Sequence, residues 1–293
     1  MPTEASIDTA DIADQLVARL RSYGPCAVAF SGGVDSAVVA MAAFLAHGHN
    51  AVAVTAVSPS LARTDRDFAA NEAMAIGIPH IEVETHEFTR PEYRRNSGDR
   101  CFFCKDTLYS ATQALLQSLP AQIIVNGANQ DDLGDHRPGM QAAAQHRVKS
   151  PLIEEGLGKQ QVRAIAAFWN LQARDKPAAP CLASRIAYGV EVTAERVARI
   201  EQAEAFLKSL LACEELRVRL EQAELARIEL PLDHISKLLT QPLRQTVTQH
   251  LRNLGFRSVT LDLEGFRSGN LNALLVPLGL GTPSVSTSPK EMS

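Results

Sequence analysis

The sequence predicts an α/β protein in which a doubly wound parallel sheet is followed by a smaller α+β domain. Short apolar runs alternate with helix-like stretches over the first 150 residues, a Gly-Gly turn follows the first of these runs, and the pattern changes after Cys213. Strands that alternate with helices are typical of a parallel sheet covered on both faces. Right-handed crossovers make such a sheet doubly wound.

The elements of the first part follow this alternation in order. Four short runs rich in apolar and β-branched residues are predicted strands, and four stretches of helical composition or periodicity are predicted helices. The segment from Asp175 to Pro180 contains two prolines and must form a loop. The strands are residues 26–30, 51–57, 81–85 and 122–126, and the helices are residues 36–46, 65–76, 105–119 and 158–169.

The second part has the order helix, strand, strand, helix, strand. Thr193 is predicted to cap a helix with an apolar stripe. Three domain-level segments are therefore expected, the last of them a disordered tail rich in Ser, Thr and Pro. The later elements are strands over 216–220 and 225–229, a helix over 235–254 and a strand over 258–263; the segments are 1–190, 191–281 and 282–293.

Composition and charge exclude several classes of protein. The chain has 293 residues, enough to bury a substantial core, and a formal net charge of −4. This balance argues against a nucleic-acid partner, because nucleic-acid surfaces usually carry a basic excess. No apolar run approaches the roughly 20 residues that span a membrane, and the N-terminus lacks the basic region of a signal peptide. We therefore expect a cytoplasmic protein without a membrane partner.

The cysteine count points to thiol chemistry rather than to disulfides. There are five cysteines, an odd number, in a chain without a secretory signal. Any cysteine chemistry should therefore involve thiolates, a metal or a cluster. Cys26 lies in an apolar run and Cys213 near an apolar stripe, so both are interpreted as small core residues.

A candidate phosphate loop lies between the first strand and its helix. It reads Ser31-Gly32-Gly33-Val-Asp35-Ser36. The glycines allow a tight turn, the helix start offers free N–H groups, and the two serines add hydroxyl donors. Asp35 would repel a phosphate, which makes sense if it helps to hold Mg²⁺ or caps the loop. The sequence lacks the Walker pattern.

This hexapeptide resembles the pyrophosphate loop of the ATP-pyrophosphatase (PP-loop) superfamily. The resemblance implies the adenine nucleotide alpha hydrolase-like fold, with ATP bound at the carboxyl ends of the strands. It also implies adenylation chemistry: a substrate oxygen attacks the α-phosphate, and pyrophosphate leaves into the loop with help from Mg²⁺.

Three further segments narrow the resemblance to the LarE family of ATP-dependent sulfur transferases. They begin at Asp99 (DRCFFCK), Asn126 (NGANQDDLGDHRPG) and Pro180 (PCLASRI), and two arginine-containing runs near Leu216 and Ala226 add to them. The resemblance spans about Gly32 to Leu271. It implies a small carboxylated pyridinium mononucleotide as substrate, whose carboxylates are adenylated and become thiocarboxylates in nickel-pincer nucleotide synthesis. Family members form ring-like hexamers, so a homo-oligomer is expected.

The resemblance also assigns roles to particular residues. Cys181 matches the sulfur-carrying position, and Ser184 and Arg185 follow it in the same segment. Arg185 could stabilise a thiolate or bind a phosphate. Lys105 matches a basic position and is assigned to neutralising a phosphate or carboxylate; the alternative is a solvated lysine at a helix start.

Cys101 and Cys104 depart from the single-cysteine members of the family, which sacrifice the sulfur of their one cysteine. Together with Cys181 they can hold three irons of a 4Fe-4S cluster and leave the fourth free. A zinc site is an alternative that needs a fourth ligand such as His86 or His136. The two cysteines could also form a redox dithiol or serve a purely structural role.

Two further groups are candidates for binding the nucleotide and the substrate. Paired carboxylates beside a nucleotide are natural Mg²⁺ ligands, although some could cap helices or form Asx-turns instead. Alternating arginines on a strand share one face and suit a monophosphate, and they match a phosphate-binding pair of the family. The carboxylates are Asp131, Asp132 and Asp135, next to Asn129 as a nucleotide-binding candidate, and the arginines are Arg217 and Arg219.

Other functions remain open at this point. A tRNA thiolase or an amide-forming ligase of the same superfamily is the main competing interpretation. The net charge argues against the first, and no glutaminase domain or cysteine triad supports the second. A nucleotide-binding regulatory protein without turnover would leave three cysteines unexplained.

Overall fold

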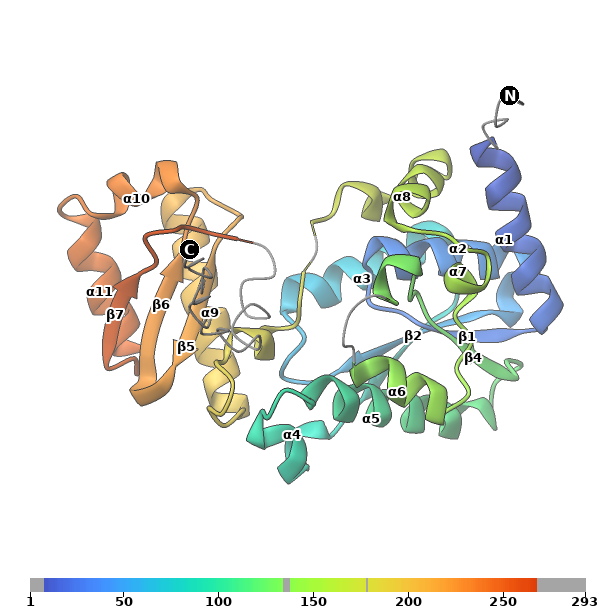
Figure 1. Ribbon diagram of the computed structural model, residues 1–293, viewed down its shortest axis with the longest axis horizontal. Helices are drawn as coiled ribbons and strands as arrows, with labels where there is room; N and C mark the ends of the chain where they lie inside the picture. Colours follow the sequence, from blue (N-terminus) through green and yellow to red (C-terminus); the bar gives the residue numbers. More distant parts are fainter. Residues whose placement is uncertain (1–7, 134–137, 178, 268–293) are drawn as a thin grey trace, which may run out of the picture.

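The computed structural model describes residues 8–133, 138–177 and 179–267, and its two β-sheets lie in separate parts of the molecule (Figure 1). The larger sheet has the strand order β3-β2-β1-β4, and its neighbouring strands are parallel. The smaller sheet has the order β5-β6-β7, with β5 antiparallel to β6 and β6 parallel to β7. The predicted α/β fold is therefore confirmed.

The strands of the larger sheet lie where the sequence predicts them, to within two residues. The central strand β1 is buried along its whole length, because helices cover both faces of the sheet. Its residue Val28 pairs with Ala53 on one side and Val125 on the other. The strands are β1 (Cys26–Ala29), β2 (Val52–Val57), β3 (His80–Glu84) and β4 (Ile123–Val125).

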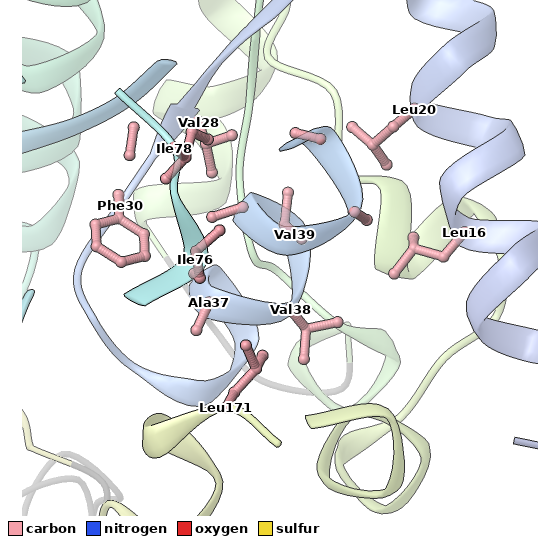
Figure 2. Close-up of a cluster of buried hydrophobic side chains, with 14 of the residues drawn as sticks. Leu16, Leu20, Val28, Phe30, Ala37, Val38, Val39, Ile76, Ile78 and Leu171 are labelled. Carbon is pink, nitrogen blue, oxygen red and sulfur yellow. The ribbon is translucent and has the colours of Figure 1, made fainter. Parts of the chain in front are cut away.

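Alternate side chains of β1 supply two different cores. Val28 and Phe30 point into a core with helices α1, α2, α3, α7 and α8, part of which Figure 2 shows. Ala27 and Ala29 point to the opposite face, which α5 and α6 cover. The helices are α1 (Thr9–Tyr23), α2 (Val34–His47), α3 (Arg63–Ile76), α4 (Pro91–Arg95), α5 (Arg100–Leu116), α6 (Pro138–Gln145), α7 (Pro151–Glu154) and α8 (Lys159–Phe168).

The second part packs helices against the small sheet. Thr193 caps α9 as predicted, because its side chain accepts from the N–H of Arg196. The single helix expected over 235–254 is instead two helices with Pro242 between them, since a proline interrupts a helix. The elements are α9 (Ala194–Leu211), β5 (Arg217–Glu221), β6 (Leu225–Glu229), α10 (Leu232–Leu238), α11 (Leu243–Asn253) and β7 (Ser258–Leu261).

The structure adds two features to the predicted picture. Helix α5 begins at Arg100 rather than at residue 105, so Cys101 and Cys104 lie in its first turns and not in a loop. The core of the second part includes Tyr93 and Ile186, which precede the predicted boundary at 190. The domain division stays a prediction, and the tail over 282–293 lies outside the described residues. None of the described helices has the length and apolar character needed to cross a membrane.

Candidate active site

The phosphate loop is held in shape by its own short side chains. Ser36 Oγ accepts from the N–H of Ser31 at 3.2 Å and donates to the carbonyl of Gly33 at 3.0 Å. Gly32 has a φ of 67°, and a Cβ there would lie 2.9 Å from Cα of Ala69. Glycine is thus required at this position both for its conformation and for its size. The loop is fixed before any phosphate binds.

A second loop closes on the start of α2. A Cβ on Gly127, just after β4, would lie 2.7 Å from the N atom of Ser36. Asn129 donates from Nδ2 to Oδ1 of Asp35 at 2.9 Å. Burial raises the pKa of Asp35, and the charge of Asp132 raises it further. Asp35 is therefore a partly buried carboxylate that would gain from a nearby cation.

The acidic run caps local structure in the described residues. Asp131 Oδ2 accepts from the N–H of Lys159 at 2.6 Å, at the start of α8. Asp132 Oδ2 accepts from the N–H of Asn129 at 3.1 Å in a reciprocal capping box. These contacts match the helix-capping alternative, and the Mg²⁺ role of the two aspartates stays a prediction. Asp135 lies outside the described residues.

Three of the five cysteines are accessible, and they interact with one another. Cys101 and Cys181 are exposed, Cys104 is half-buried, and Cys26 and Cys213 are buried as predicted. The pKa of Cys104 is raised to about 12, first by burial and then by the charges of Cys181, Glu87 and Cys101. Without a metal, Cys104 is therefore a protonated thiol at neutral pH.

Lys105 connects the cysteines to the nucleotide side of the site. Burial opposes its charge, but the phenol of Tyr109 and the thiol of Cys104 outweigh burial and raise the pKa of Lys105. The hydroxyl of Tyr109 in turn accepts from Asn126 Nδ2 at 3.4 Å. Asn126 is the residue before Gly127, so a hydrogen bond links the second loop to Tyr109, and charge interactions link Tyr109 to Lys105 and the thiols.

The three thiols were predicted to hold a cluster, with a single zinc ion as the alternative. Among the described residues, no three His, Cys, Asp or Glu side chains gather closely enough to bind one metal ion. A single zinc ion needs its ligands around one point, whereas cluster cysteines bind separate irons and lie farther apart. The two segments supply three accessible thiols, and the cluster itself stays a prediction.

The side-chain contacts of Arg185 hold the Cys181 loop in place. It forms a buried ion pair with Glu204, with Nε 3.0 Å from Oε1. Its guanidinium also donates to the carbonyls of Pro180 and Cys181 and to Oγ of Ser184. These contacts fix the backbone of the sulfur-carrying candidate. The catalytic roles predicted for Ser184 and Arg185 stay untested.

The two arginines of β5 lie in different environments. Arg219 is buried and makes a two-pronged pair with Glu229, each contact 3.0 Å long. For Arg217, no ion pair with a carboxylate is found within the described part of the chain. Burial and the charge of Arg185 lower the pKa of Arg217. Of the predicted clamp, Arg217 therefore carries the charge that an anion could neutralise.

Three buried polar residues near the thiols have no signal in the sequence. Glu87 is 1% exposed, its Oε2 has no hydrogen-bond partner among the described residues, and its charge acts on Cys104. Asn96 and Arg100 form a buried hydrogen bond just before the cysteine pair. Only their contacts with distant segments distinguish them from ordinary surface residues.

Comparison with known proteins places this site in a family. An asparagine synthase family model matches residues 10–92, which include the phosphate loop. An uncharacterized protein of Synechocystis is 45% identical over 85% of this chain and 92% of its own length. The pyridinium-3,5-bisthiocarboxylic acid mononucleotide synthase of Lactiplantibacillus plantarum is 34% identical over 91% of this chain and 96% of its own length. An uncharacterized protein of Methanocaldococcus jannaschii is 25% identical over 82% of this chain.

The parallel sheet and the preformed phosphate loop define an ATP-using enzyme of the PP-loop superfamily. The match over nearly the whole length of a characterised relative is more specific. The chain belongs to the LarE family, that of pyridinium-3,5-bisthiocarboxylic acid mononucleotide synthase, and is an ATP-dependent sulfurtransferase.

Proposed function

We propose that this enzyme adenylates carboxylates of a pyridinium mononucleotide and converts them into thiocarboxylates, as in the synthesis of a nickel-pincer nucleotide. The observation that carries the proposal is that the charges of Cys101 and Cys181 act on both Cys104 and Lys105, which joins the two cysteine-bearing segments electrostatically. The name of the Lactiplantibacillus relative supports the substrate class.

The first step uses the phosphate loop. A substrate carboxylate oxygen attacks the α-phosphorus of ATP, and the bond to the pyrophosphate oxygen breaks. The N–H groups and hydroxyls of residues 31–36 would stabilise the departing charge, which forms where these donors already point. Asp35 would hold Mg²⁺, since burial has left its carboxylate short of solvation.

The second step uses the thiols. A sulfur nucleophile attacks the acyl carbon of the adenylate, the bond from that carbon to the bridging oxygen breaks, and AMP leaves with its electron pair. Lys105 would neutralise the charge on the acyl oxygen or the phosphate, and Arg217 would bind the monophosphate of the substrate. Arg185 would keep the Cys181 backbone in place.

Cys101, Cys104 and Cys181 would hold a 4Fe-4S cluster. When bound, that cluster would supply a sulfide on the iron that no cysteine ligates, so the protein sulfur need not be consumed. Without a cluster, the acylated Cys181 would lose its Cα proton, and cleavage of its Cβ–S bond would release the thiocarboxylate and leave dehydroalanine.

Two other functions use the same fold. A tRNA thiolase could use the same three cysteines, and an amide-forming ligase would share the part that the asparagine synthase model matches. The length of the match to the mononucleotide synthase supports sulfur transfer to a small substrate over both. The homo-oligomer stays a prediction.

The test measures substrate and sulfur source separately. We expect a dicarboxylated pyridinium mononucleotide, and not tRNA, to stimulate ATP cleavage to AMP and pyrophosphate. Stimulation by tRNA alone would contradict the proposal.

The sulfur source is tested on protein reconstituted without oxygen. We expect about four irons per chain together with acid-labile sulfide, both lost in the Cys101→Ala, Cys104→Ala double variant. Absence of iron, together with conversion of Cys181 to dehydroalanine after turnover, would instead identify a sacrificial enzyme.

A further inference from the structure

Asn96 is an unusual residue between the two cysteine-bearing segments. It lies between α4 and α5 and is 0% exposed although its side chain is a primary amide. Its backbone has a φ of 55° and a ψ of 48°, the left-handed region that non-glycine residues seldom adopt. Such conformations persist where the surrounding structure enforces them, and they concentrate at functional sites.

One end of the Asn96 side chain holds the segment that follows the Cys181 loop. Nδ2 donates to the carbonyl of Ala187 at 2.9 Å and to those of Ile186 and Val190 at 3.2 Å. An amide has two N–H hydrogens, so these three carbonyls share them. The backbone carbonyl of Asn96 also accepts from the N–H of Gly189 at 3.1 Å.

The other end of the same side chain holds the cysteine helix. Asn96 Oδ1 accepts from the guanidinium of Arg100 at 2.5 Å. Arg100 is the first residue of α5, directly before Cys101, and is 7% exposed. A hydrogen-bonded connection therefore runs from the Cys181 side, through Asn96 and Arg100, to the helix that carries Cys101 and Cys104.

We propose that Asn96 and Arg100 form a positioning bridge that sets the distance between Cys181 and the Cys101–Cys104 pair. The inference rests on the proposed sulfur transfer, in which these three thiols act together. Neither residue needs to touch the substrate, so both are positioning residues. A displacement of about 1 Å in a reacting group can lower a rate by about 100-fold, which gives such a bridge its importance.

The chain contains a matched control on its surface. Asn170 also has a left-handed backbone, with a φ of 54°, and its Oδ1 accepts from Arg174 at 2.7 Å over the same four-residue spacing. This second pair is exposed: Asn170 lies after α8, and Arg174 belongs to the 3₁₀ turn Gln172–Asp175. It reproduces the local geometry of the first pair without joining two cysteine segments.

The test compares Asn96→Gly with Asn170→Gly. Glycine keeps the left-handed backbone and removes only the side chain. In metal-free protein, a short bis-alkylating reagent reports how often Cys181 meets Cys101 or Cys104, read by peptide mapping. We expect Asn96→Gly to lower this cross-linking rate and the kcat of sulfur transfer by about 10–100-fold, with ATP–pyrophosphate exchange and the KM for ATP unchanged. Asn170→Gly should change none of these.

Unchanged cross-linking in Asn96→Gly, or equal slowing in Asn170→Gly, would overturn the bridge. If Asn96→Gly fails to fold, Arg100→Met removes the donor at the other end and should slow cross-linking, with partial recovery in Arg100→Lys. Failure of the proposed function would appear differently: the native enzyme would form no thiocarboxylate, while the cross-linking comparison would still be readable.

Discussion

The phosphate loop and the arginine group of the second part are two predicted anion sites built in opposite ways. The loop between β1 and α2 uses backbone N–H groups and serines, and Asp35 is its one charged side chain. The second site contains two buried carboxylates, Glu204 and Glu229, which pair with Arg185, Arg219 and Arg227 and whose charges also act on Arg217. Glu221 and Asp262 pair with Arg227 as well.

The difference shows how each site obtains selectivity. Backbone dipoles are fixed by geometry, so the loop depends on shape and tolerates no added atom. Guanidinium groups are long and strongly charged, so they need carboxylates to hold and neutralise them before one remains for a ligand. An added side-chain atom should therefore abolish binding at the phosphate loop. Removal of a carboxylate should instead destabilise the arginine group.

The largest expected effect is on the second site. Glu229 is 0% exposed and accepts from both Arg219 and Arg227, so Glu229→Ala leaves the buried Arg219 without a carboxylate, whereas Arg227 keeps Glu221 and Asp262. We expect the free energy of unfolding to fall by about 3–5 kcal/mol. Glu195→Ala, which removes an exposed carboxylate paired with Arg199, should cost at most about 0.5 kcal/mol. Urea unfolding measures both losses of stability. Equal losses in the two variants would contradict the prediction that burial sets the contribution of an ion pair.

The next effect tests crowding at the phosphate loop. Gly32→Ala adds a Cβ 2.9 Å from Cα of Ala69 at a φ of 67°, whereas Gly48→Ala at a φ of 57° meets nothing within 4 Å. Backbone strain alone should cost Gly48→Ala about 1–3 kcal/mol, because its ψ of −135° lies outside the left-handed helical region. Overpacking should add about 1–3 kcal/mol in Gly32→Ala. Gly32→Ala should also abolish ATP–pyrophosphate exchange, while Gly48→Ala keeps it.

A smaller effect separates the two arginines of β5. Arg217 is the residue of the pair without a carboxylate partner in the described chain, so Arg217→Gln should leave folding stability unchanged and raise the KM for the mononucleotide roughly tenfold. Arg219→Gln should destabilise the protein, because it leaves the buried Glu229 short of a partner. Thermal unfolding and steady-state kinetics on both variants provide the comparison. A stability loss in Arg217→Gln would mean that it, too, is structural.

The smallest effect concerns Asp35. Burial raises its folded-state pKa above the usual 3.8, so the native state binds this proton more tightly than the unfolded chain does. Its destabilising contribution therefore begins above pH 3.8 and is complete above the raised pKa. Asp35→Asn should stabilise the ATP-free protein at neutral pH by on the order of 1 kcal/mol, with the gain shrinking as the pH falls toward 4. A gain in stability that does not change with pH would show that the buried charge of Asp35 is not its cause.

The features that could be predicted from the sequence are those made by neighbouring residues. The phosphate loop was predictable because its contacts lie within Ser31–Ser36, and strands β1, β2 and β4 because each is a short apolar run. The arginine face of β5 followed from alternation. Helix α1 was missed although Ala13, Leu16 and Leu20 give it a helical stripe that sequence analysis could have found.

Other features depend on contacts that a linear pattern does not show. The start of α5 was placed too late because adjacent Phe102 and Phe103 cannot share one face of an amphipathic helix, and Asp99 does not cap it with its side chain. The pairing of Arg185 with Glu204 and the bridge through Asn96 join residues far apart in the sequence. Such partners can be assigned only once the fold has brought them together.

Each part of the molecule contains one buried cysteine that can report local opening of its core. Cys26 is the first residue of β1 and belongs to the core of the first part, and Cys213 belongs to the core of the second part. A thiol reagent should label the exposed Cys101 and Cys181 first, Cys104 more slowly because its raised pKa keeps the thiol protonated, and the two buried cysteines only when their surroundings open. The rates of the two buried cysteines would then give the opening free energy of each core separately, without any introduced probe.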